Sequence, residues 1–123
     1  INQLPSITLG ANPSICAGVI AANLSYSATS GSPDQYSVDY NAGANAAGFA
    51  DVSNIVLPVS PIVLAAPGAA SAGIYHATLT VINSTTGCEA DNAISVVINP
   101  LPTITLGSNP SICEGTTLTN ISY

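Results

Sequence analysis

The opening segment of this chain returns near its other end. Residues Ile1 to Tyr26 read INQLPSITLGANPSICAGVIAANLSY and residues Ile98 to Tyr123 read INPLPTITLGSNPSICEGTTLTNISY, with 17 of 26 aligned positions identical and no gap. The offset of 97 residues is far longer than the repeats of helical solenoids or propeller blades and matches one β-sandwich domain of roughly 100 residues. We therefore predict one complete repeat at 1–97, followed at 98–123 by the first strands of the next. The chain is expected to be a window from a longer tandem array.

The composition favours a folded domain built of strands. Apolar residues make up 47% of the chain and the mean hydropathy is +0.48, which argues against disorder. Most apolar residues are small or β-branched, with one Phe and neither Trp nor Met. Such side chains suit the pleated surface of a sheet.

The charge balance excludes two classes of partner. The chain has no Lys and no Arg, six acidic residues and one His, which gives a net charge of −6. Nucleic acids and anionic lipids both require cations on the protein, so neither is expected to bind. The apolar run Ile55–Ala66 is broken by Pro58 and Pro61 and is too short to span a membrane. Export signals are expected elsewhere in the parent chain.

The cysteines follow the repeat. Cys113 is Cys16 plus 97, so a complete repeat carries two cysteines and the third belongs to the next copy. We predict a disulfide between Cys16 and Cys88, which would close a loop of 73 residues, stabilise the fold by roughly 4 kcal/mol and indicate an oxidising setting. Cys113 would then pair within the next repeat. A Cys88–Cys113 bond that staples consecutive repeats stays open as an alternative.

Alternating apolar and polar residues, separated by Gly, Pro and Asn turn signals, predict seven strands. The predicted strands are Ser6–Leu9, Ala22–Ala28, Gln35–Tyr40, Phe49–Leu57, Ser60–Ala66, Gly73–Asn83 and Ala93–Ile98. The clearest of them, Gly73–Asn83, should be central, whereas Ala11–Gly18 should be a pinned loop and Asn41–Gly48 a loop or short helical turn. In Ala22–Ala28 the inward residues should be Leu24, Tyr26 and Ala28. This pattern predicts an all-β fold, an immunoglobulin-like antiparallel β-sandwich in tandem repeat.

Three segments carry a family resemblance. SITLGANPSICAG, GIYHATLTVINSTTGC and ISVVINPLP resemble the tandem immunoglobulin-like or PKD-like repeats of very large surface proteins secreted by Bacteroidota, including gliding-motility adhesins. The shared elements are a Cys after the first strand, a G-x-Y strand that ends in an Asn-rich turn with Gly-Cys, and a Pro-rich junction. The resemblance implies an extracellular, cell-anchored filament or stalk that is exported through the outer membrane.

Candidate catalytic and metal-binding residues are sparse. His76 is the only candidate general base, and it is expected to lie exposed in mid-strand without a nucleophile beside it. No close ligand pair such as C-x-x-C predicts a metal centre. Calcium is a lesser hypothesis, because carboxylates at the junctions of extracellular sandwiches can bind it. The carboxylates concerned are Asp34, Asp39, Asp51, Glu89, Asp91 and Glu114. We expect no catalytic residues, no cofactor and no metal.

The function favoured by the repeat, the cysteines and the resemblance is structural. The chain would be a spacer or stalk repeat of an extracellular, cell-surface adhesin or filament that mediates adhesion or gliding motility through the whole array. The alternative is a glycan- or protein-binding β-sandwich module, in one version stabilised by calcium; an enzyme is the least favoured class. The expected partners are neighbouring repeats of the same chain. Apolar residues of the second copy should take the places of their counterparts in the first, or else pair with a neighbouring molecule by strand addition. These residues are Ile104, Leu106, Ile112, Leu118 and Ile121.

Overall fold

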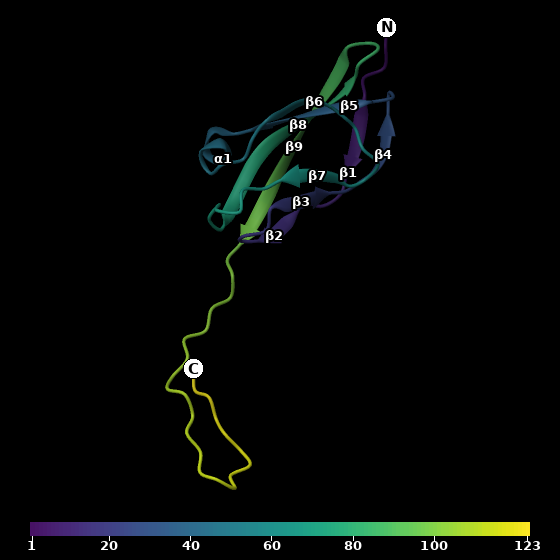
Figure 1. The fold of residues 1–123 in the computed structure, drawn as a ribbon. Coiled ribbons are helices and arrows are strands. Elements are labelled where there is room, and N and C mark those ends of the chain that lie inside the picture. Colours follow the sequence, from purple (N-terminus) through teal and green to yellow (C-terminus); the bar gives the residue numbers. More distant parts are fainter.

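The structure, a computed structural model, describes every residue from Ile1 to Tyr123 and consists mainly of strands (Figure 1). It has nine strands and one short helix. Their bounds are β1 Ser6–Leu9, β2 Ser14–Cys16, β3 Ala21–Leu24, β4 Tyr26–Ser30, β5 Gln35–Tyr40, α1 Ala42–Ala46, β6 Val52–Val56, β7 Ile62–Ala65, β8 Gly73–Asn83 and β9 Cys88–Asn99. The prediction of a mostly β fold is confirmed.

The strands form two layers. One layer is a five-stranded sheet in the order β2-β9-β8-β5-β6, and the other consists of two strand pairs, β1-β4 and β3-β7. Every pairing is antiparallel except that of β2 with β9. The two layers face each other in Figure 1, and the buried side chains come from both. The largest fully buried ones are Leu24, Ile62, Leu79, Val38, Val81, Val96 and Pro5.

Strong alternation predicted three strands with their observed bounds. β1, β5 and β8 begin and end where the sequence pattern places them, and β8 is the central strand of its sheet, as expected. Each of these strands turns its apolar set toward the other layer, as the burial of Val38 and Leu79 illustrates. Alternation of apolar and polar residues predicts a strand reliably when one face of the strand is buried and the other is exposed to solvent.

The strand predicted at Ala22–Ala28 is in fact two strands. The strand is interrupted at Ser25, whose carbonyl oxygen accepts a 2.7 Å hydrogen bond from the Gly10 amide. The next amide, that of Tyr26, donates a 2.9 Å hydrogen bond to the Ser60 hydroxyl. β3 then pairs with β7, whereas β4 pairs with β1. The expectation that Ala28 points inward is wrong, because every residue of β4 after Tyr26 is exposed.

A short strand lies where a loop was predicted. Ser14–Cys16 forms β2, because its backbone pairs in parallel with the last residues of β9, including Asn99. β9 itself begins at Cys88, five residues before the predicted start at Ala93. β9 pairs with β8 from Cys88 to Ile98, and this pairing holds the polar first half of β9 in the sheet.

The Asn41–Gly48 segment contains one helical turn, one of the two forms expected. α1 begins after Asn41, whose side-chain oxygen accepts a 2.8 Å hydrogen bond from the Ala44 amide, as a helix N-cap does. Phe49 follows this segment and is buried in the core. The centroid of its ring lies 4.9 Å from the ring centroids of both Tyr40 and Tyr75. These three rings close the core beside the helix.

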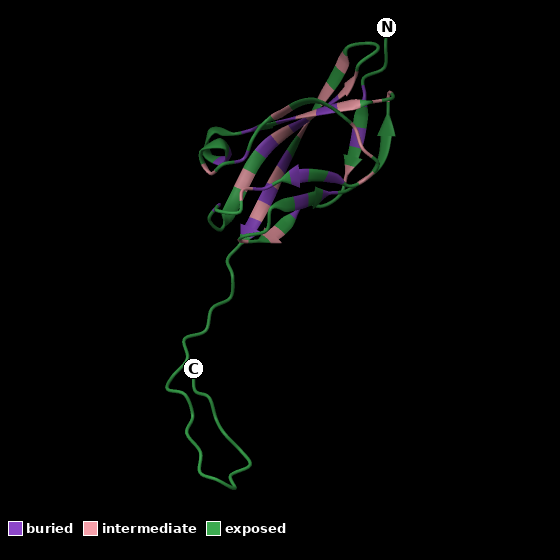
Figure 2. Ribbon diagram, in the orientation of Figure 1, coloured by how far each residue is buried: buried purple, intermediate pink, exposed green.

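The segment after β9 leaves the folded body. β9 ends at Asn99 and Ile98 is only 3% exposed, so the folded unit extends two residues beyond the predicted boundary at 97. Residues 100–123 contain no strand or helix, and all of them are exposed (Figure 2). The segment does not complete the sandwich from which it emerges.

The segment nevertheless repeats local geometry of the first copy. The Gly107 amide donates to the Ser122 carbonyl at 2.9 Å, as Gly10 donates to Ser25 at 2.7 Å, 97 residues earlier. The two Cys-x-Gly turns also agree, because Gly18 and Gly115 have φ angles of 89° and 87°. Equivalent positions therefore share turn geometry even though only one copy forms strands.

Candidate functional site

The two cysteines of the folded body lie at its opposite ends. Cys16 ends β2 and pairs with Asn99, the residue at which the chain leaves the body. Cys88 begins β9 and pairs with Asn83 across the β8–β9 turn, at the end of the molecule where the chain starts (Figure 1). Cys16 is exposed and Cys88 is half-buried. We call the end with Asn99 the exit pole and the end with the β8–β9 turn the starting pole.

The structure contradicts the predicted disulfide between Cys16 and Cys88. The position opposite Cys16 is Asn99, which lies eleven residues from Cys88 along β9 (99 − 88), or roughly 36 Å at the rise of a strand. A disulfide requires Cα atoms within about 7 Å. All three cysteines are free thiols.

The alternative Cys88–Cys113 bond fails for the same reason. Cys113 lies beyond Asn99, in the segment that leads away from the exit pole, whereas Cys88 lies at the starting pole. If Cys113 held the place of Cys16 in a second copy, it would have no partner within that copy either. Sequence spacing could not reveal this, because it does not show that the two cysteines flank one long strand.

His76 lies exposed on the outer face of the five-stranded sheet, as predicted. It borders a shallow polar depression of about 230 Å³ together with Asp39, Asn41 and Thr78. No hydrogen bond joins the His76 ring to Asp39 or Thr78, whereas the His76 backbone carbonyl accepts a 3.0 Å hydrogen bond from the Asn41 amide. The geometry assembles no nucleophile, base and orienting group in one place.

Three of the six carboxylates accept hydrogen bonds in separate local structures. Asp51 accepts a 2.8 Å hydrogen bond from the Tyr40 amide, and Asp91 accepts one of 2.6 Å from the Thr80 hydroxyl. Asp34 accepts hydrogen bonds from the amide and the hydroxyl of Ser84. Three or more His, Cys, Asp or Glu side chains that could hold a metal ion are not found together anywhere in the chain.

Asp34 fixes the turn at the starting pole. The hydrogen bonds from the Ser84 hydroxyl and amide favour the ionised carboxylate, so they lower the pKa of Asp34 below its usual 3.8. Ser84 lies in the turn that joins β8 to β9. Asp34 precedes β5, so its carboxylate ties the β8–β9 turn to the start of a neighbouring strand.

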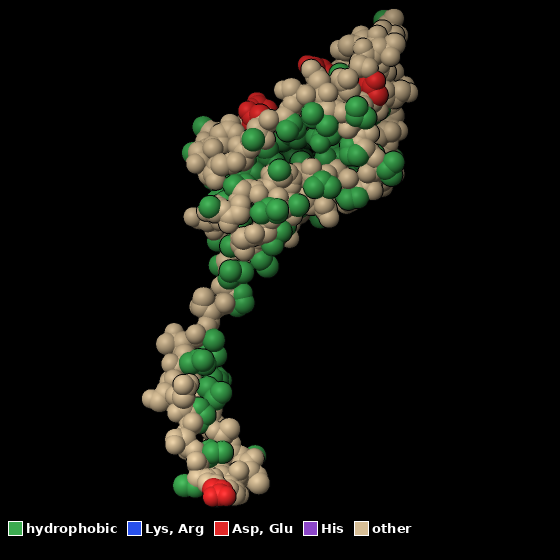
Figure 3. All heavy atoms as spheres, in the orientation of Figure 1, with side chains coloured by type: hydrophobic (Ala, Val, Ile, Leu, Met, Phe, Trp, Pro, Cys, Tyr) green, Lys and Arg blue, Asp and Glu red, His purple; other side chains and the backbone are tan.

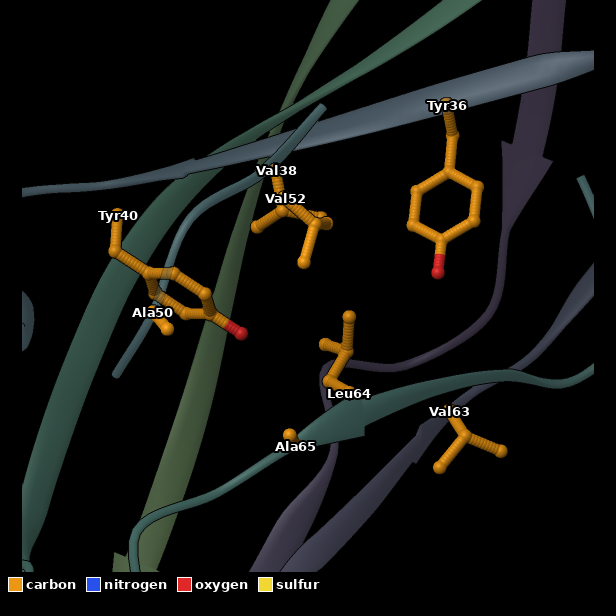
Figure 4. A pocket seen from close by; sticks show the side chains of 8 residues that line it. All are labelled: Tyr36, Val38, Tyr40, Ala50, Val52, Val63, Leu64 and Ala65. Carbon is orange, nitrogen blue, oxygen red and sulfur yellow. The ribbon is translucent and has the colours of Figure 1, made fainter. Parts of the chain in front are cut away.

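An apolar crevice between the two layers was not predicted from the sequence. Its volume is about 110 Å³, and eight apolar residues line it: Tyr36, Val38, Tyr40, Ala50, Val52, Val63, Leu64 and Ala65. Figure 4 shows the two Tyr side chains reaching from β5 toward Leu64 on β7. Figure 3 shows apolar side chains gathered around the hollow on this face.

The tyrosines of the crevice are held in their neutral form. Burial raises the pKa of Tyr36. Burial, with smaller contributions from Tyr36 and Asp51, raises the pKa of Tyr40 to about 12. Since the lining contains no charged side chain, the crevice suits an apolar occupant.

No protein-family model matches the chain, and neither a curated protein nor a solved structure matches it. The structure contains no helix of the length and apolar character needed to cross a membrane.

Proposed function

We propose that this chain is an immunoglobulin-like repeat of a tandem array, and that the array forms an extracellular stalk or filament at a cell surface. The array, rather than any one repeat, would mediate adhesion or gliding motility. The observation that carries the proposal is that the Ile1–Tyr26 sequence returns from Ile98, at the end of β9, where the chain leaves the body at the pole opposite its start. A unit with its two ends at opposite poles extends an array in one direction.

The strand order supports the immunoglobulin-like assignment. The first part of the chain contributes β1 to one layer and then crosses to the other layer as β2. There β2 pairs in parallel with the last strand, β9, while the remaining pairings are antiparallel. Two packed layers of mainly antiparallel strands in about 100 residues are typical of the immunoglobulin-like class, which supports this part of the proposal.

The junction between repeats would be short. Ile98 is the last buried residue of the body, and Pro102 is the counterpart of Pro5, which is fully buried in the first copy. Only Asn99, Pro100 and Leu101 lie between them, a span of roughly 10 Å. Proline in so short a connection limits bending, so neighbouring repeats would touch and the array would be a stiff rod.

The surface suits a spacer. The chain has no Lys or Arg, and three of its six carboxylates accept hydrogen bonds in separate local structures. A surface with no cations and a net negative charge repels nucleic acid and anionic lipid. We assign the repeat no catalytic role and no resident cofactor or metal.

The apolar crevice favours a second candidate, the binding module. β7 has β3 on one side and no strand on the other, and the crevice opens beside it. An extended peptide could add to this free edge and place apolar side chains in the crevice. A polar glycan suits this site less well, because all eight lining residues are apolar.

The proposal is tested with a protein of two complete repeats, made by joining residues 27–99 directly after Tyr123; we call it the two-repeat protein. Each repeat should be about 40 Å long, because β9 has 12 residues. Small-angle X-ray scattering should give a narrow distance distribution with a longest dimension of about 80 Å. Inserting about eight Gly and Ser residues after Asn99 should broaden it. A compact or equally broad distribution without the insert would contradict the stiff rod.

A further inference from the structure

The exit pole presents the Cys16 thiol beside the connection to the next repeat. Cys16 pairs with Asn99, and the next amide, that of Ala17, donates a 2.9 Å hydrogen bond to the Asn99 carbonyl. The Asn99 side chain in turn donates to the Ser14 hydroxyl at 2.6 Å. Since these bonds fix β2 against the end of β9, the exposed thiol stays next to the point where the chain leaves the body.

The starting pole presents the Cys88 thiol beside the residues where the chain enters the body. Cys88 pairs with Asn83, whose side chain donates a 3.0 Å hydrogen bond to the Gly31 carbonyl. Gly31 lies directly against Leu4, because a Cβ atom added to it would come within 2.4 Å of the Leu4 carbonyl oxygen. The contacts therefore run from Cys88 through Asn83 and Gly31 to Leu4.

In a tandem array, the exit pole of one repeat meets the starting pole of the next. The counterpart of Leu4 in the second copy is Leu101, only two residues after Asn99. In an array, Cys16 of one repeat lies next to Asn99, and the Cys88 position of the following repeat lies a few contacts from Leu101. We propose that these two thiols form a disulfide across each junction, so that every repeat is bonded to its neighbours through one cysteine at each pole. This inference rests on the proposed tandem array.

The chemistry requires a disulfide oxidant. The two thiols lose two protons and two electrons and form one S–S bond, while a small-molecule or protein disulfide takes up the electrons and protons and becomes two thiols. Such an exchange is favoured outside the cytosol, which agrees with the proposed location. The bond would run parallel to the three-residue connection and oppose bending and rotation at the junction.

The two-repeat protein tests this pairing through a count of its thiols. It has four cysteines: Cys16, Cys88, Cys113 and the second repeat's counterpart of Cys88. After equilibration with oxidised and reduced glutathione, alkylation and intact-mass measurement should find two thiols protected and two alkylated. Cys16→Ser should leave all three remaining thiols alkylated, whereas Cys113→Ser, the matched control at the same position of the second copy, should leave one alkylated and two protected.

The identity of the bond is fixed by the Cys88→Ser variant of the first repeat. This change should preserve the bond, and cleavage with an acid-specific protease should release Cys16 linked to the peptide that contains the second repeat's cysteine. Four alkylated thiols in the unmodified two-repeat protein, or a bond from Cys88 to Cys16 or Cys113, would overturn the inference. An elongated particle with four free thiols would overturn the disulfide alone, and a compact or flexible particle would overturn the array itself.

Discussion

Two stretches of nearly the same sequence adopt different structures in this molecule. Ile1–Tyr26 contributes β1, β2 and β3 to the sandwich, whereas Ile98–Tyr123 contributes β-structure only through the last two residues of β9. The two copies share the turns that need only local contacts, such as the hydrogen bond of Val19 to Cys16 and that of Thr116 to Cys113, both 3.1 Å.

The difference shows which contacts make the strands. In the first copy, β2 pairs with β9 and β3 pairs with β7, so these partners come from residues 62–65 and 88–99. The second copy has no such partners within the chain. Short strands without a sheet to join are marginal in water, whereas Gly-containing turns form locally. The first copy therefore needs partner strands from the rest of the repeat, because its own sequence alone does not form strands.

The largest expected difference between the copies is in their response to core truncation. Leu24 is fully buried between the layers, so Leu24→Ala should lower the free energy of unfolding by about 2–5 kcal/mol. Its counterpart Ile121 is 59% exposed, and Ile121→Ala should change that free energy by less than about 0.5 kcal/mol. Urea unfolding followed by circular dichroism measures both. Equal effects would mean that the second copy is part of the same folded unit.

Glycine substitutions should give a smaller contrast. Gly31 has a φ of 68° and lies against the Leu4 backbone, so Gly31→Ala should cost about 2 kcal/mol or more. Gly18 has a φ of 89° but open space around it, so Gly18→Ala should cost about 1 kcal/mol, the conformational strain alone. Gly115→Ala, in the second copy, should leave the unfolding midpoint unchanged. If the Gly31 variant were as stable as the Gly115 variant, Gly31 would not be tightly packed against Leu4 at the starting pole.

The same contrast explains what the sequence could predict. Gln35–Tyr40 and Gly73–Asn83 alternate strongly because each has one buried face, and both strands were predicted with their observed bounds. β2 was missed because three residues, Ser14–Cys16, become a strand only through a partner more than 80 positions away. The Ser25 break was missed for the same reason, since Gly10 and Ser60 cause it.

The candidate site depended still more on distant contacts. The disulfide prediction paired the two cysteines of the predicted repeat, but only the register of β9 shows that they occupy opposite poles. The crevice was missed because it forms between β5, β6 and β7, and its size depends on how the two layers pack. His76 could be placed, because its position on an alternating strand fixes the face on which it lies.

High pH should lower the stability of the folded body, through Tyr40. The pKa of Tyr40 is about 12 in the folded protein and near 10 when unfolded, so above pH 10 the unfolded state loses this proton first. The stability contributed by the neutral ring is complete below pH 10 and is lost as the pH rises from 10 to 12. The melting temperature should fall over this range, and Tyr40→Phe should reduce the fall. A variant that falls as steeply as the unmodified protein would exclude Tyr40 as the cause.

The smallest expected effect is the loss of the stabilisation that Asp34 gives to the β8–β9 turn at low pH. The pKa of Asp34 is lowered in the folded state, so its stabilising effect is present above about pH 3.8 and is lost as the pH falls through the lower folded value. Amide hydrogen exchange at Ser84 should accelerate in Asp34→Asn at neutral pH, while exchange in β5 and the centre of β8 stays unchanged. Asp39→Asn, within β5 and away from the turn, is the matched control.

Amide hydrogen exchange of residues 104–123 tests most directly whether the missing partners alone keep the second copy unfolded. In the chain of 123 residues these amides should exchange at the rates of an unstructured peptide. In the two-repeat protein, where residues 27–99 supply the partners a second time, the amides at the counterparts of β1, β2 and β3 should become protected to the same extent as those of the first copy. Rapid exchange in both proteins, with the first copy still protected, would contradict the equivalence of the two copies.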